Sequence, residues 1–398
     1  MIVARNHRIV LGVTGGIAAY KTPSLVRLFQ KNSVEVKVVC TRAALTLVAQ
    51  QALSVVSGHT VYTDDPSADF DLVHVSLAKW ADFLLVCPAT ANTIAKIAHG
   101  IADNLLTTLA LSFEKRLVIA PAMNTAMWLS SATQENVALL SGRGALLLPV
   151  DEGDLACGDI GPGRLLAPET IVDFMLSLAS PRCLVNKKVL VSSGPTHEPI
   201  DAVRYIGNRS SGKMGAALAR AAMLAGARVT LVSGPSLAPP PPGVRVLTVT
   251  TAAEMLAVLE KEFDETDVCI MAAAVADFRP ARRIEGKKHR DHQAPWDLTL
   301  VPNPDIAEHL GGRKKRQFLA CFSLETDDDL ASALEKMKRK KCDLMIINTT
   351  EGSLELDSTE VRIVSPDASV EHLPRQSKKS AAAHIIERIA QQLGVSHG

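Results

Sequence analysis

The chain has 398 residues, of which 47% are hydrophobic and 21% are charged. This composition excludes a largely disordered chain, and the length favours two globular domains over one. The 43 Lys and Arg residues nearly balance the 42 Asp and Glu residues, so the overall charge favours neither nucleic acid nor a membrane surface as a partner. We therefore expect anionic ligands to be held at local sites.

The start of the chain and its cysteines indicate the compartment. The apolar run before the first glycines is too short for a secretory signal, and no later segment approaches 18 uninterrupted apolar residues. Seven cysteines occur singly, without CxxC pairs, which argues against a disulfide framework and a zinc site. We expect a cytoplasmic protein in which most cysteines are buried.

The predicted elements of the first half alternate between strand and helix. An apolar strand over residues 9–13 leads into Gly15 and Gly16, a helix as far as residue 28 and a second strand over 34–40. Three further strands are predicted over 83–87, 117–120 and 145–149. Continuous apolar strands spaced by helices are typical of a parallel sheet covered on both faces. This pattern predicts a doubly wound, Rossmann-like α/β domain.

The second half repeats the same plan. A strand over 188–192, Gly194, a helix from about 212 to 225 and a strand over 228–233 open it. The later elements are predicted strands over 244–250, 268–273, 318–323 and 344–348 and a closing amphipathic helix over 379–393. We place the domain boundary between residues 182 and 183, where a helical pattern stops and a new strand begins.

Glycines and polar loops at the ends of the first strands indicate a ligand site. Gly15 and Gly16 leave main-chain N–H groups at the positive end of a helix, which favours a phosphate. Two polar loops, 88–93 and 121–127, follow later strands at the sheet edge where open α/β folds bind ligands. The absence of a full G-x-G-x-x-G, and of an acidic residue where Thr41 follows the second strand, favours a mononucleotide. A tight turn and helix caps without any ligand would explain the same residues.

Five spaced segments carry a family resemblance. They are residues 14–21, His74 ahead of 79–82, 88–93, 121–127 and 156–164. In order and spacing these segments resemble the flavin-dependent cysteine decarboxylases, which act on phosphopantothenoylcysteine and on C-terminal cysteines of peptides. The resemblance implies a flavodoxin-like first domain with FMN as its cofactor.

The chemistry of that family accounts for the residue types. A cysteine carboxylate loses CO₂ slowly because the developing carbanion has no electron sink, and oxidation of the thiol by flavin supplies one. By resemblance, His74 supports the flavin-linked steps, while Asn124 and Met127 bind the substrate carboxylate. Cys157, in a glycine-rich segment resembling a flap, is implied to donate a proton to the enethiolate intermediate.

The resemblance also implies the cofactor ligands and the assembly. The implied FMN ligands follow the first three strands of the predicted sheet and are Gly15, Gly16, Ile17, Thr41, Thr90, Asn92 and Thr93. Family members form trimers with the flavin at subunit contacts. We therefore expect a homo-oligomer built from trimers of the first domain and dimers of the second.

Four segments of the second half resemble the phosphopantothenate–cysteine ligase domain. They are residues 193–196, 201–215, 271–278 and 303–306. The fused order of the two halves matches the bacterial bifunctional enzymes of coenzyme A biosynthesis. The implied substrates are 4′-phosphopantothenate, cysteine and CTP, and the expected domains are 1–182 for decarboxylation and 183–398 for ligation.

In the ligase family, the acid attacks the α-phosphate of CTP, and cysteine then displaces CMP from the acyl-cytidylate. Such chemistry favours Mg²⁺ together with Lys or Arg at the triphosphate, although the sequence does not identify the metal ligands. Asn208 and Arg204 are implied to contact the acyl intermediate. Ser210 and Ser211, at a helix start, supply donors for a substrate phosphate, with a capping box as the alternative.

The implied CTP ligands lie in loops after the strands, in the lysine loop and on one helix. They are Met271, Ala272, Ala273, Asp277, Lys287, Pro304, Asp305, Ile306, Ala307, Phe322, Lys336 and Lys340. Lys287 is also implied to be catalytic. Without the resemblance, the run 336–341 is interpreted as a solvated basic face.

Two departures from the ligase pattern leave a second interpretation open. His289 stands where the family's K-x-K-K motif has a lysine, and residues 348–361 lack the family's usual aromatic and asparagine. The alternative function is an active decarboxylase whose ligase half is inactive or uses another nucleotide. Two rival classes are a nicotinamide-dependent oxidoreductase, which lacks its acidic ribose ligand here, and a non-catalytic flavin-binding subunit, which would not need His74, Asn124 and Cys157 together.

Overall fold

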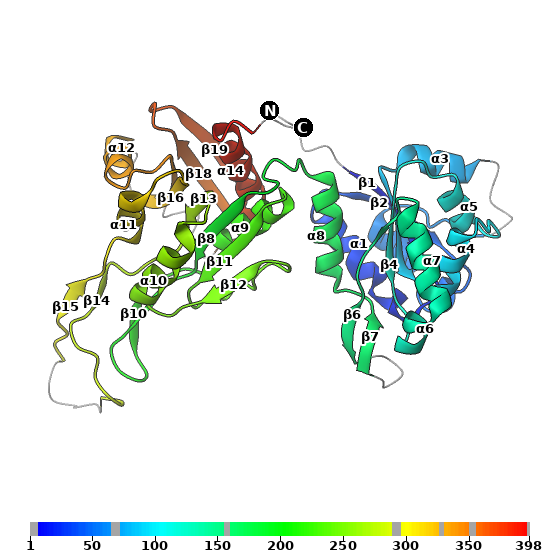
Figure 1. Cartoon of the computed structure of the whole chain (residues 1–398), viewed down its shortest axis with the longest axis horizontal. Helices are drawn as coiled ribbons and strands as arrows, with labels where there is room; N and C mark the ends of the chain where they lie inside the picture. Colours follow the sequence, from blue (N-terminus) through cyan, green and yellow to red (C-terminus); the bar gives the residue numbers. More distant parts are fainter. Residues whose placement is uncertain are drawn as a thin grey trace. The chain divides into compact units, whose positions relative to one another are not determined.

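A computed structural model describes residues 7–64, 72–154, 160–288, 296–325, 330–349 and 356–395. The chain divides into two compact units, Met1–Ala179 and Ser180–Gly398 (Figure 1). The predicted boundary after residue 182 lies close to this division. The assignment of one activity to each half stays a prediction.

The first unit is built on a five-stranded parallel sheet in the order β2-β1-β3-β4-β5. Its strands are β1 (Arg8–Val13), β2 (Glu35–Cys40), β3 (Phe83–Ala89), β4 (Arg116–Pro121) and β5 (Leu146–Leu147). Every residue of β3 is buried, as expected for a central strand covered on both faces. The predicted α/β class is confirmed, although the last predicted strand shrinks to two residues.

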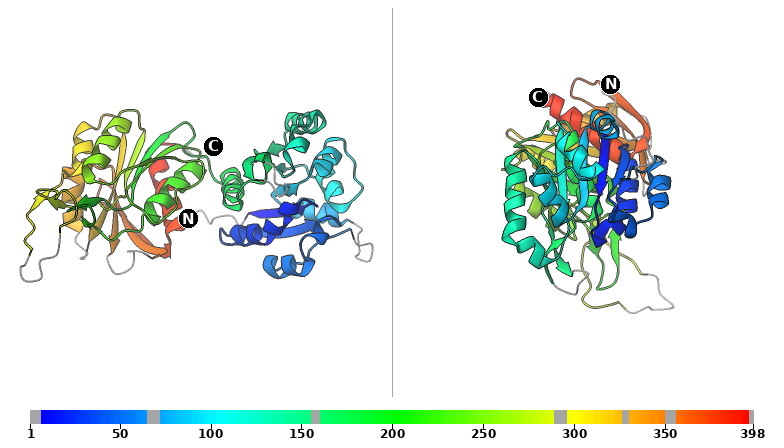
Figure 2. Two further views of the ribbon diagram at one scale, coloured as in Figure 1. Left: turned by 90° about the horizontal axis from the view of Figure 1, so that it is seen from below. Right: turned by 90° about the vertical axis from the view of Figure 1, so that its right-hand side faces the viewer.

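Helices cover both faces of this sheet, as Figures 1 and 2 show. One face packs against α1 (Thr22–Gln30), α2 (Gln50–Ser57) and α8 (Pro168–Ala179). The other packs against α3 (Val73–Trp80), α4 (Ala91–Ala98), α5 (Leu105–Leu111) and α7 (Ser131–Gly142). The first predicted helix is split into a 3-10 turn, η1 (Ile17–Lys21), and α1, because Pro23 favours the first turn of a new helix.

Three short elements complete the first unit. They are η2 (Ala44–Thr46), α6 (Thr125–Leu129) and a hairpin of β6 (Asp151–Asp154) with β7 (Ile160–Arg164). The hairpin was not among the predicted strands. Its sequence is rich in glycine and charge, so it lacks the apolar alternation by which strands are recognised.

The second unit has an eight-stranded sheet in the order β12-β11-β8-β13-β16-β17-β18-β19. The strands in chain order are β8 (Lys188–Ser193), β11 (Arg228–Ser233), β12 (Arg245–Thr248), β13 (Val268–Met271), β16 (Phe318–Glu325), β17 (Leu344–Thr349), β18 (Ser358–Val364) and β19 (Val370–Ser377). The first six strands in this order, from β12 to β17, are parallel to one another. Strand β18 pairs antiparallel with β17, and β19 pairs antiparallel with β18. The two antiparallel strands were not predicted, because the edge strand β19 is mostly polar and contains Pro374.

Two layers of helices cover this sheet. On what we call the α9/α14 face lie α9 (Lys213–Leu224) and the long C-terminal α14 (Lys378–Gln392). On the opposite α10–α12 face lie α10 (Ala252–Phe263), α11 (Ile306–Arg313) and α12 (Leu330–Arg339). Both helices of the α9/α14 face were predicted from sequence, over about 212–225 and 379–393, and both are present.

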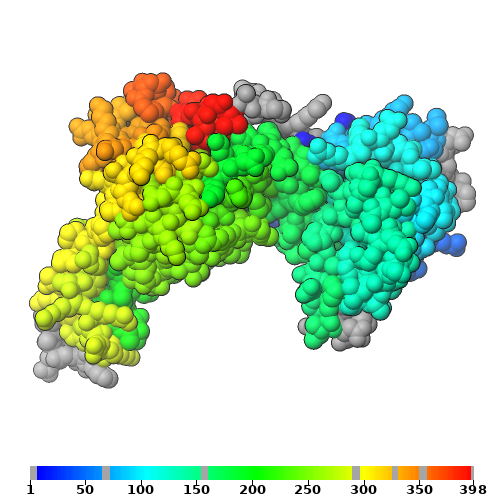
Figure 3. All heavy atoms as spheres, viewed as in Figure 1, coloured from blue at the N-terminus to red at the C-terminus, as the bar shows by residue number. Residues whose placement is uncertain are grey.

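An arm formed by two small antiparallel ribbons projects from the rest of the second unit, in green and yellow in Figures 1 and 3. It pairs β9 (His197–Pro199) with β10 (Tyr205–Gly207) and β14 (Phe278–Pro280) with β15 (Leu300–Pro302). Main-chain hydrogen bonds join the ribbons: Ile284 N–H donates to Ile200 O at 2.9 Å, and Ala202 N–H donates to Gly286 O at 3.0 Å.

The described ranges contain six cysteines, and all six are buried and form no disulfide. Burial raises the pKa of the Cys40 and Cys87 thiols to about 12. Within those ranges, no cluster of His, Cys, Asp or Glu has the arrangement of a metal site, and no helix has the length and apolar character needed to cross a membrane.

Candidate active sites

A cavity of about 640 Å³ opens at the carboxyl ends of the central strands of the first unit. Six predicted site residues line it: Gly15, Gly16, Ile17, Thr90, Asn124 and Met127. They come from the turn after β1, the loop after β3 and the loop after β4. The structure therefore brings together three segments that are distant in sequence, at the edge where α/β sheets bind ligands.

Thr14 ties two of these segments together. Its hydroxyl donates to Pro88 O at 2.5 Å and accepts a hydrogen bond from Thr90 N–H at 3.1 Å. Thr14 is almost fully buried, so these bonds hold the turn after β1 against the loop after β3 without competition from water. The Gly15–Gly16 turn is thereby placed beside Thr90.

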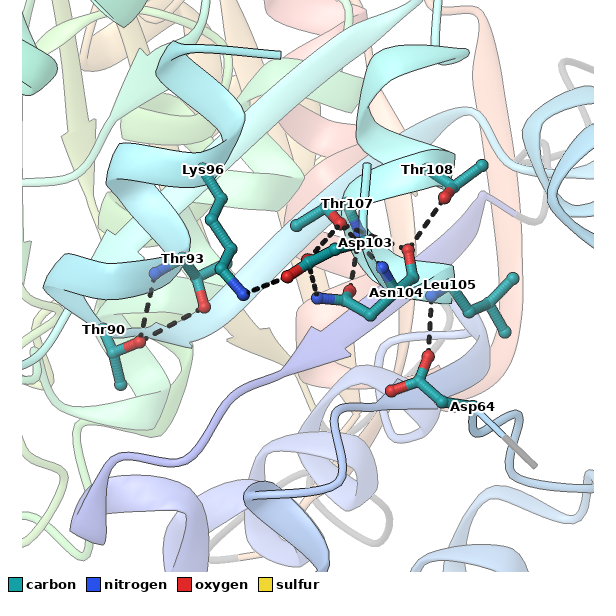
Figure 4. A network of polar contacts seen from close by, with 9 residues as sticks. All are labelled: Asp64, Thr90, Thr93, Lys96, Asp103, Asn104, Leu105, Thr107 and Thr108. Atoms are coloured by element: carbon teal, nitrogen blue, oxygen red, sulfur yellow. Dashed lines mark hydrogen bonds and ion pairs between the residues drawn. The ribbon is translucent and has the colours of Figure 1, made fainter. Parts of the chain in front are cut away.

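Thr90 has both of the roles considered for it. It caps α4 by accepting from Thr93 N–H at 3.4 Å, and its hydroxyl lies 3.2 Å from that of Thr93. Figure 4 shows these two hydroxyls facing each other, with Lys96 further along α4 paired with Asp103. Thr90 also lines the cavity, whereas Asn92 and Thr93 do not.

Asn124 is the N-cap of α6. Its Oδ1 accepts a hydrogen bond from Met127 N–H at 2.8 Å, which fixes the orientation of the amide. Among the described residues, no partner holds the NH₂ group of Asn124. The side chain can therefore donate to a carboxylate in the cavity, where Met127 is also exposed.

The β6–β7 hairpin closes one side of the cavity through Gly163 and Arg164, and Leu165, directly after β7, borders it as well. Met123 N–H donates to Gly163 O at 2.9 Å, so β7 is attached to the loop that carries Asn124. Gly163 has a φ of +132°, and a Cβ there would overlap Met123 O. Only glycine fits this close approach.

Gly163→Ala should lower the stability of the first unit by about 1–3 kcal/mol and loosen the cavity, because strain and overlap act together. Thermal unfolding and the flavin absorbance per chain measure the two effects. Gly142→Ala is the matched control, since that glycine ends α7 with open space around it and no positive φ. Equal melting temperatures for Gly163→Ala and wild type would contradict this account of the hairpin.

Other predicted residues of the first unit lie elsewhere. His74 is half-buried on α3 and does not line the cavity of its own chain. The Thr41 hydroxyl accepts a hydrogen bond from Ala44 N–H, at the start of η2. Cys157 falls outside the described residues. Tyr20, Lys21 and Arg164 also line the cavity. They belong to the motif segments 14–21 and 156–164, but the sequence analysis gave them no role.

In the second unit, two loops at the carboxyl edge of the sheet are bonded to each other. Ala273 N–H donates to the Ser192 hydroxyl at 3.2 Å, and Ala276 N–H donates to the fully buried Thr196 hydroxyl at 3.0 Å. Asn208 donates from Nδ2 to Val275 O at 2.9 Å. The predicted Asn208 and the predicted Met271–Ala273 segment therefore lie at one site.

Asp201 organises the base of the arm. Its side chain is fully buried, accepts from Val203 N–H and Arg204 N–H at 2.7 Å each, and pairs with the Arg204 guanidinium at 3.1 Å. It also accepts from Lys288 N–H at 3.3 Å. These bonds, that from Val203 foremost, hold the pKa of Asp201 below its usual value.

The Asp201 carboxylate bonds to both Arg204 and Lys288. It therefore brings Arg204, predicted to bind the substrate, next to the loop that carries Lys287, the predicted catalytic lysine. Lys287 is exposed. Arg204 and Lys288 both stack against the Trp296 ring, with their charged groups 5.3 and 4.4 Å from its centroid. His289 lies outside the described residues.

The predicted CTP residues divide between the two faces of the sheet. On the α10–α12 face, Asp305 caps α11 and pairs with Lys340 at 3.0 Å. Ile306 and Ala307 are buried there, so their main chain rather than their side chains can face a ligand. Phe322 instead packs against the α9/α14 face, and Asp277 is exposed in the arm. The assignment of these residues to one CTP site stays a prediction.

Comparison with known proteins follows the same two halves. A flavoprotein family model matches residues 3–180, and the model of the DNA/pantothenate metabolism flavoprotein C-terminal domain matches residues 184–393. The coenzyme A biosynthesis bifunctional protein CoaBC of Vibrio vulnificus is 41% identical over 396 residues, covering 98% of both chains. The chain belongs to the CoaBC family.

Other CoaBC proteins are similar as well. That of Escherichia coli K12 is 43% identical over 349 residues, covering 86% of both chains. A solved C-terminal domain of a CoaBC protein is 34% identical, covers 54% of this chain and all of that domain, and has a TM-score of 0.47. The motif resemblance is confirmed, and so is the predicted enzyme class, a bifunctional phosphopantothenoylcysteine decarboxylase and phosphopantothenate–cysteine ligase.

Proposed function

We propose that the chain catalyses two successive steps of coenzyme A biosynthesis. The second unit joins 4′-phosphopantothenate to cysteine with CTP by way of an acyl-cytidylate. The first unit then decarboxylates the product to 4′-phosphopantetheine with FMN. The observation that carries this proposal is the cavity in which the Gly15–Gly16 turn and the Asn124 amide meet.

The residues of that cavity fit FMN. Its volume lies within the usual range for small-molecule sites, and Ile17, Met123 and Leu165 supply apolar walls. Lys21, in the turn before α1, supplies a cation near the helix start, where a phosphate is stabilised. A Cβ on Gly16 would meet Thr90 at 3.4 Å, so the glycine leaves room along that wall. Bound FMN would supply the two-electron oxidation of the substrate thiol and return the electrons later.

The protein's own residues would then hold the substrate and move its protons. The Asn124 NH₂ donates to the substrate carboxylate while its Oδ1 stays fixed by Met127 N–H. Met127 borders the same opening. Cys157, in the segment that joins β6 to β7, is the proposed proton donor to the enethiolate. The roles of Thr41, Asn92 and Thr93 as FMN ligands stay predictions.

His74 requires a neighbouring copy in this proposal. It lies on α3, and the cavity of its own chain is lined by other segments. We infer that a second copy supplies His74 to the flavin, as expected for trimers with sites at subunit contacts. We also retain the prediction that ligase units dimerise.

In the ligase unit, Asn208 and Arg204 would hold the acyl group, with Met271–Ala273 beside them. Lys340 already pairs with Asp305 at the start of α11, and we propose that the CTP phosphates and Mg²⁺ bind near this pair. Lys336 lies on α12, which ends at Arg339, directly before Lys340. An assay of the separate ligase unit with CTP and with ATP decides between this proposal and its alternatives, another nucleotide or an inactive ligase.

Residues 1–182 and 183–398 expressed separately should give a yellow decarboxylase and a colourless ligase, because each compact unit has its own apolar core. Mass spectrometry would follow 4′-phosphopantetheine and CO₂ from the first, and 4′-phosphopantothenoylcysteine from the second with Mg²⁺ and CTP. Replacing CTP by ATP is the control for nucleotide choice. A colourless first half, or a second half that makes no product with any nucleoside triphosphate, would refute the corresponding function.

A further inference from the structure

The two oxygens of the Asp201 carboxylate have different partners. Oδ1 accepts both bonds from the turn that follows Asp201, one from Val203 N–H and one from Arg204 N–H, at 2.7 Å each. Oδ2 accepts from the Arg204 guanidinium at 3.1 Å and from Lys288 N–H at 3.3 Å. One oxygen therefore fixes the local turn, and the other connects this turn to the loop that carries Lys287.

The Arg204 side chain reinforces this connection. Its Nη2 donates to Lys288 O at 3.4 Å, so Lys288 is held through both its main-chain N–H and its carbonyl oxygen. The Arg204 and Lys288 cations also lie 5.3 and 4.4 Å from the centroid of the same ring, that of Trp296. A guanidinium has five N–H groups, so Arg204 can keep these bonds and still donate to an acyl group.

Lys287 lies between two attachments of its loop. On one side, Ala202 N–H donates to Gly286 O at 3.0 Å. On the other, Lys288 N–H donates to Asp201 Oδ2. Both chain neighbours of Lys287 are therefore bonded to the turn that follows β9. The Asp201 side chain is fully buried, so water does not compete for the second of these attachments.

We propose that Asp201 is a positioning residue of the ligase, whose single buried carboxylate holds the Lys287 main chain and the Arg204 guanidinium in one fixed arrangement. This inference rests on the proposed ligase function, and it gives a role to a residue that is neither a proposed substrate contact nor a proposed nucleotide contact. A group that is already oriented loses less freedom when the transition state forms. The contributions of Arg204 and Lys287 to ligation would therefore depend on each other through Asp201.

Asp201→Asn separates the two roles of the carboxylate. The amide oxygen can still accept from Val203 N–H and Arg204 N–H, so the turn should survive. The amide NH₂ would instead face the Lys288 N–H and the guanidinium, which places donors against donors. With CTP and 4′-phosphopantothenate both saturating, single-turnover formation of the acyl-cytidylate by the full chain should slow by about tenfold or more. Decarboxylation should be unchanged.

Asp267→Asn is the matched control in the same unit. Asp267 also accepts a distant main-chain N–H, that of Lys188, at 2.8 Å, and it pairs with the Arg316 guanidinium at 2.7 Å. It directly precedes β13, and Lys188 begins β8, so this carboxylate lies at the amino ends of the strands, away from the proposed site. Its replacement should leave the ligation rate unchanged. Equal losses in the two variants would overturn the proposal, because they would reflect the stability of the unit.

A double-mutant cycle distinguishes positioning from a merely structural role. If Asp201 acts through Lys287, Lys287→Gln should cost much less in the Asp201→Asn chain than the factor of about 10² expected in the wild-type chain. Losses that multiply independently would overturn the proposal.

Trp296 gives a readout that does not depend on catalysis. The sequence has three tryptophans, and Trp80→Phe with Trp128→Phe leaves Trp296 as the one that fluoresces. Acrylamide should quench Trp296 more strongly once Asp201→Asn is added, because the loop then holds its cations less firmly against the ring. Unchanged quenching would show that Asp201 does not hold the loop.

Should Asp201→Asn fail to fold, Lys288→Pro removes the same N–H donor from the loop, and Lys288→Gln, which keeps that N–H, is its control. Ligation should fall further in Lys288→Pro, and equal rates in the two variants would overturn the proposal. A wild-type chain that forms no acyl-cytidylate, while Asp201→Asn still exposes Trp296 to acrylamide, would refute the ligase function and leave the connection to the loop standing.

Discussion

Asn124→Asp is expected to reduce decarboxylation by about 10²-fold or more in kcat/KM. It replaces a hydrogen bond to the substrate carboxylate by repulsion between two carboxylates. The fold should survive, because an aspartate Oδ1 accepts the Met127 N–H bond as asparagine does. Steady-state rates, with flavin absorbance as the test of an intact site, measure the effect.

Asn104→Asp is the matched control for Asn124→Asp. Asn104 is also the N-cap of a helix in the first unit, α5, and accepts from Thr107 N–H at 3.0 Å (Figure 4). It does not line the cavity. It should retain wild-type decarboxylation. If both variants lose activity equally, the loss reflects helix capping and the proposed carboxylate site is wrong.

Asn124→Asp, combined with His74→Asn, tests whether each decarboxylase site is shared between two copies of the chain. His74→Asn and Asn124→Asp should each be inactive alone, yet co-expression should restore about a quarter of the sites in randomly mixed trimers. Those sites combine an intact His74 from one copy with an intact Asn124 from another. Failure of the mixture to regain any activity would place both residues in the cavity of a single chain.

Lys287→Gln is expected to slow ligation by about 10²-fold or more while decarboxylation is unchanged. An exposed cation that stabilises the developing negative charge of a transition state contributes on this scale. The glutamine keeps much of the side-chain length, so the arm should stay folded. Single-turnover formation of the acyl-cytidylate separates this effect from weaker CTP binding.

Lys288→Gln is the control for Lys287→Gln, because the Lys288 ammonium lies 4.4 Å from the Trp296 ring centroid and has a structural contact to lose. Its ligation rate should fall less. A Lys287→Gln enzyme with normal ligation, or one that is less impaired than Lys288→Gln, would move the proposed role to another residue of the loop.

The parallel cores of both units could be predicted from sequence, whereas their edges could not. Buried strands such as β3 form continuous apolar runs, so local composition is sufficient to identify them. Strand β19 is polar and exposed along most of its length, and the β6–β7 hairpin contains two glycines with positive φ. Their pairing depends on residues brought near by the rest of the fold, which no local pattern records.

The same distinction applies to the sites. Gly15, Gly16 and Asn124 follow strands directly, and the sheet therefore delivers them to one edge. Asp201 joins Arg204 to Lys288 across more than eighty positions of sequence. It opens the motif segment 201–215, but the pattern gave it no role, because its contact with Lys288 arises only in the folded arm. Elsewhere in the second unit, Lys378 directly precedes the predicted amphipathic helix 379–393, and no local pattern indicates that it is buried. Its burial arises only when α14 packs beside α9.

The burial of the cysteines has a practical consequence for chemical labelling. Thiolates, not thiols, react with alkylating reagents. Burial raises the pKa of Cys40, Cys87, Cys183 and Cys269. The hydrogen bond with Cys342, together with burial, raises the pKa of Cys321, and Cys342 is itself shielded from solvent. Cys157 is the one remaining cysteine of the sequence. A maleimide or iodoacetamide dye added to the native protein should therefore attach to the proposed flap alone, and its fluorescence would report substrate binding without the removal of any other cysteine.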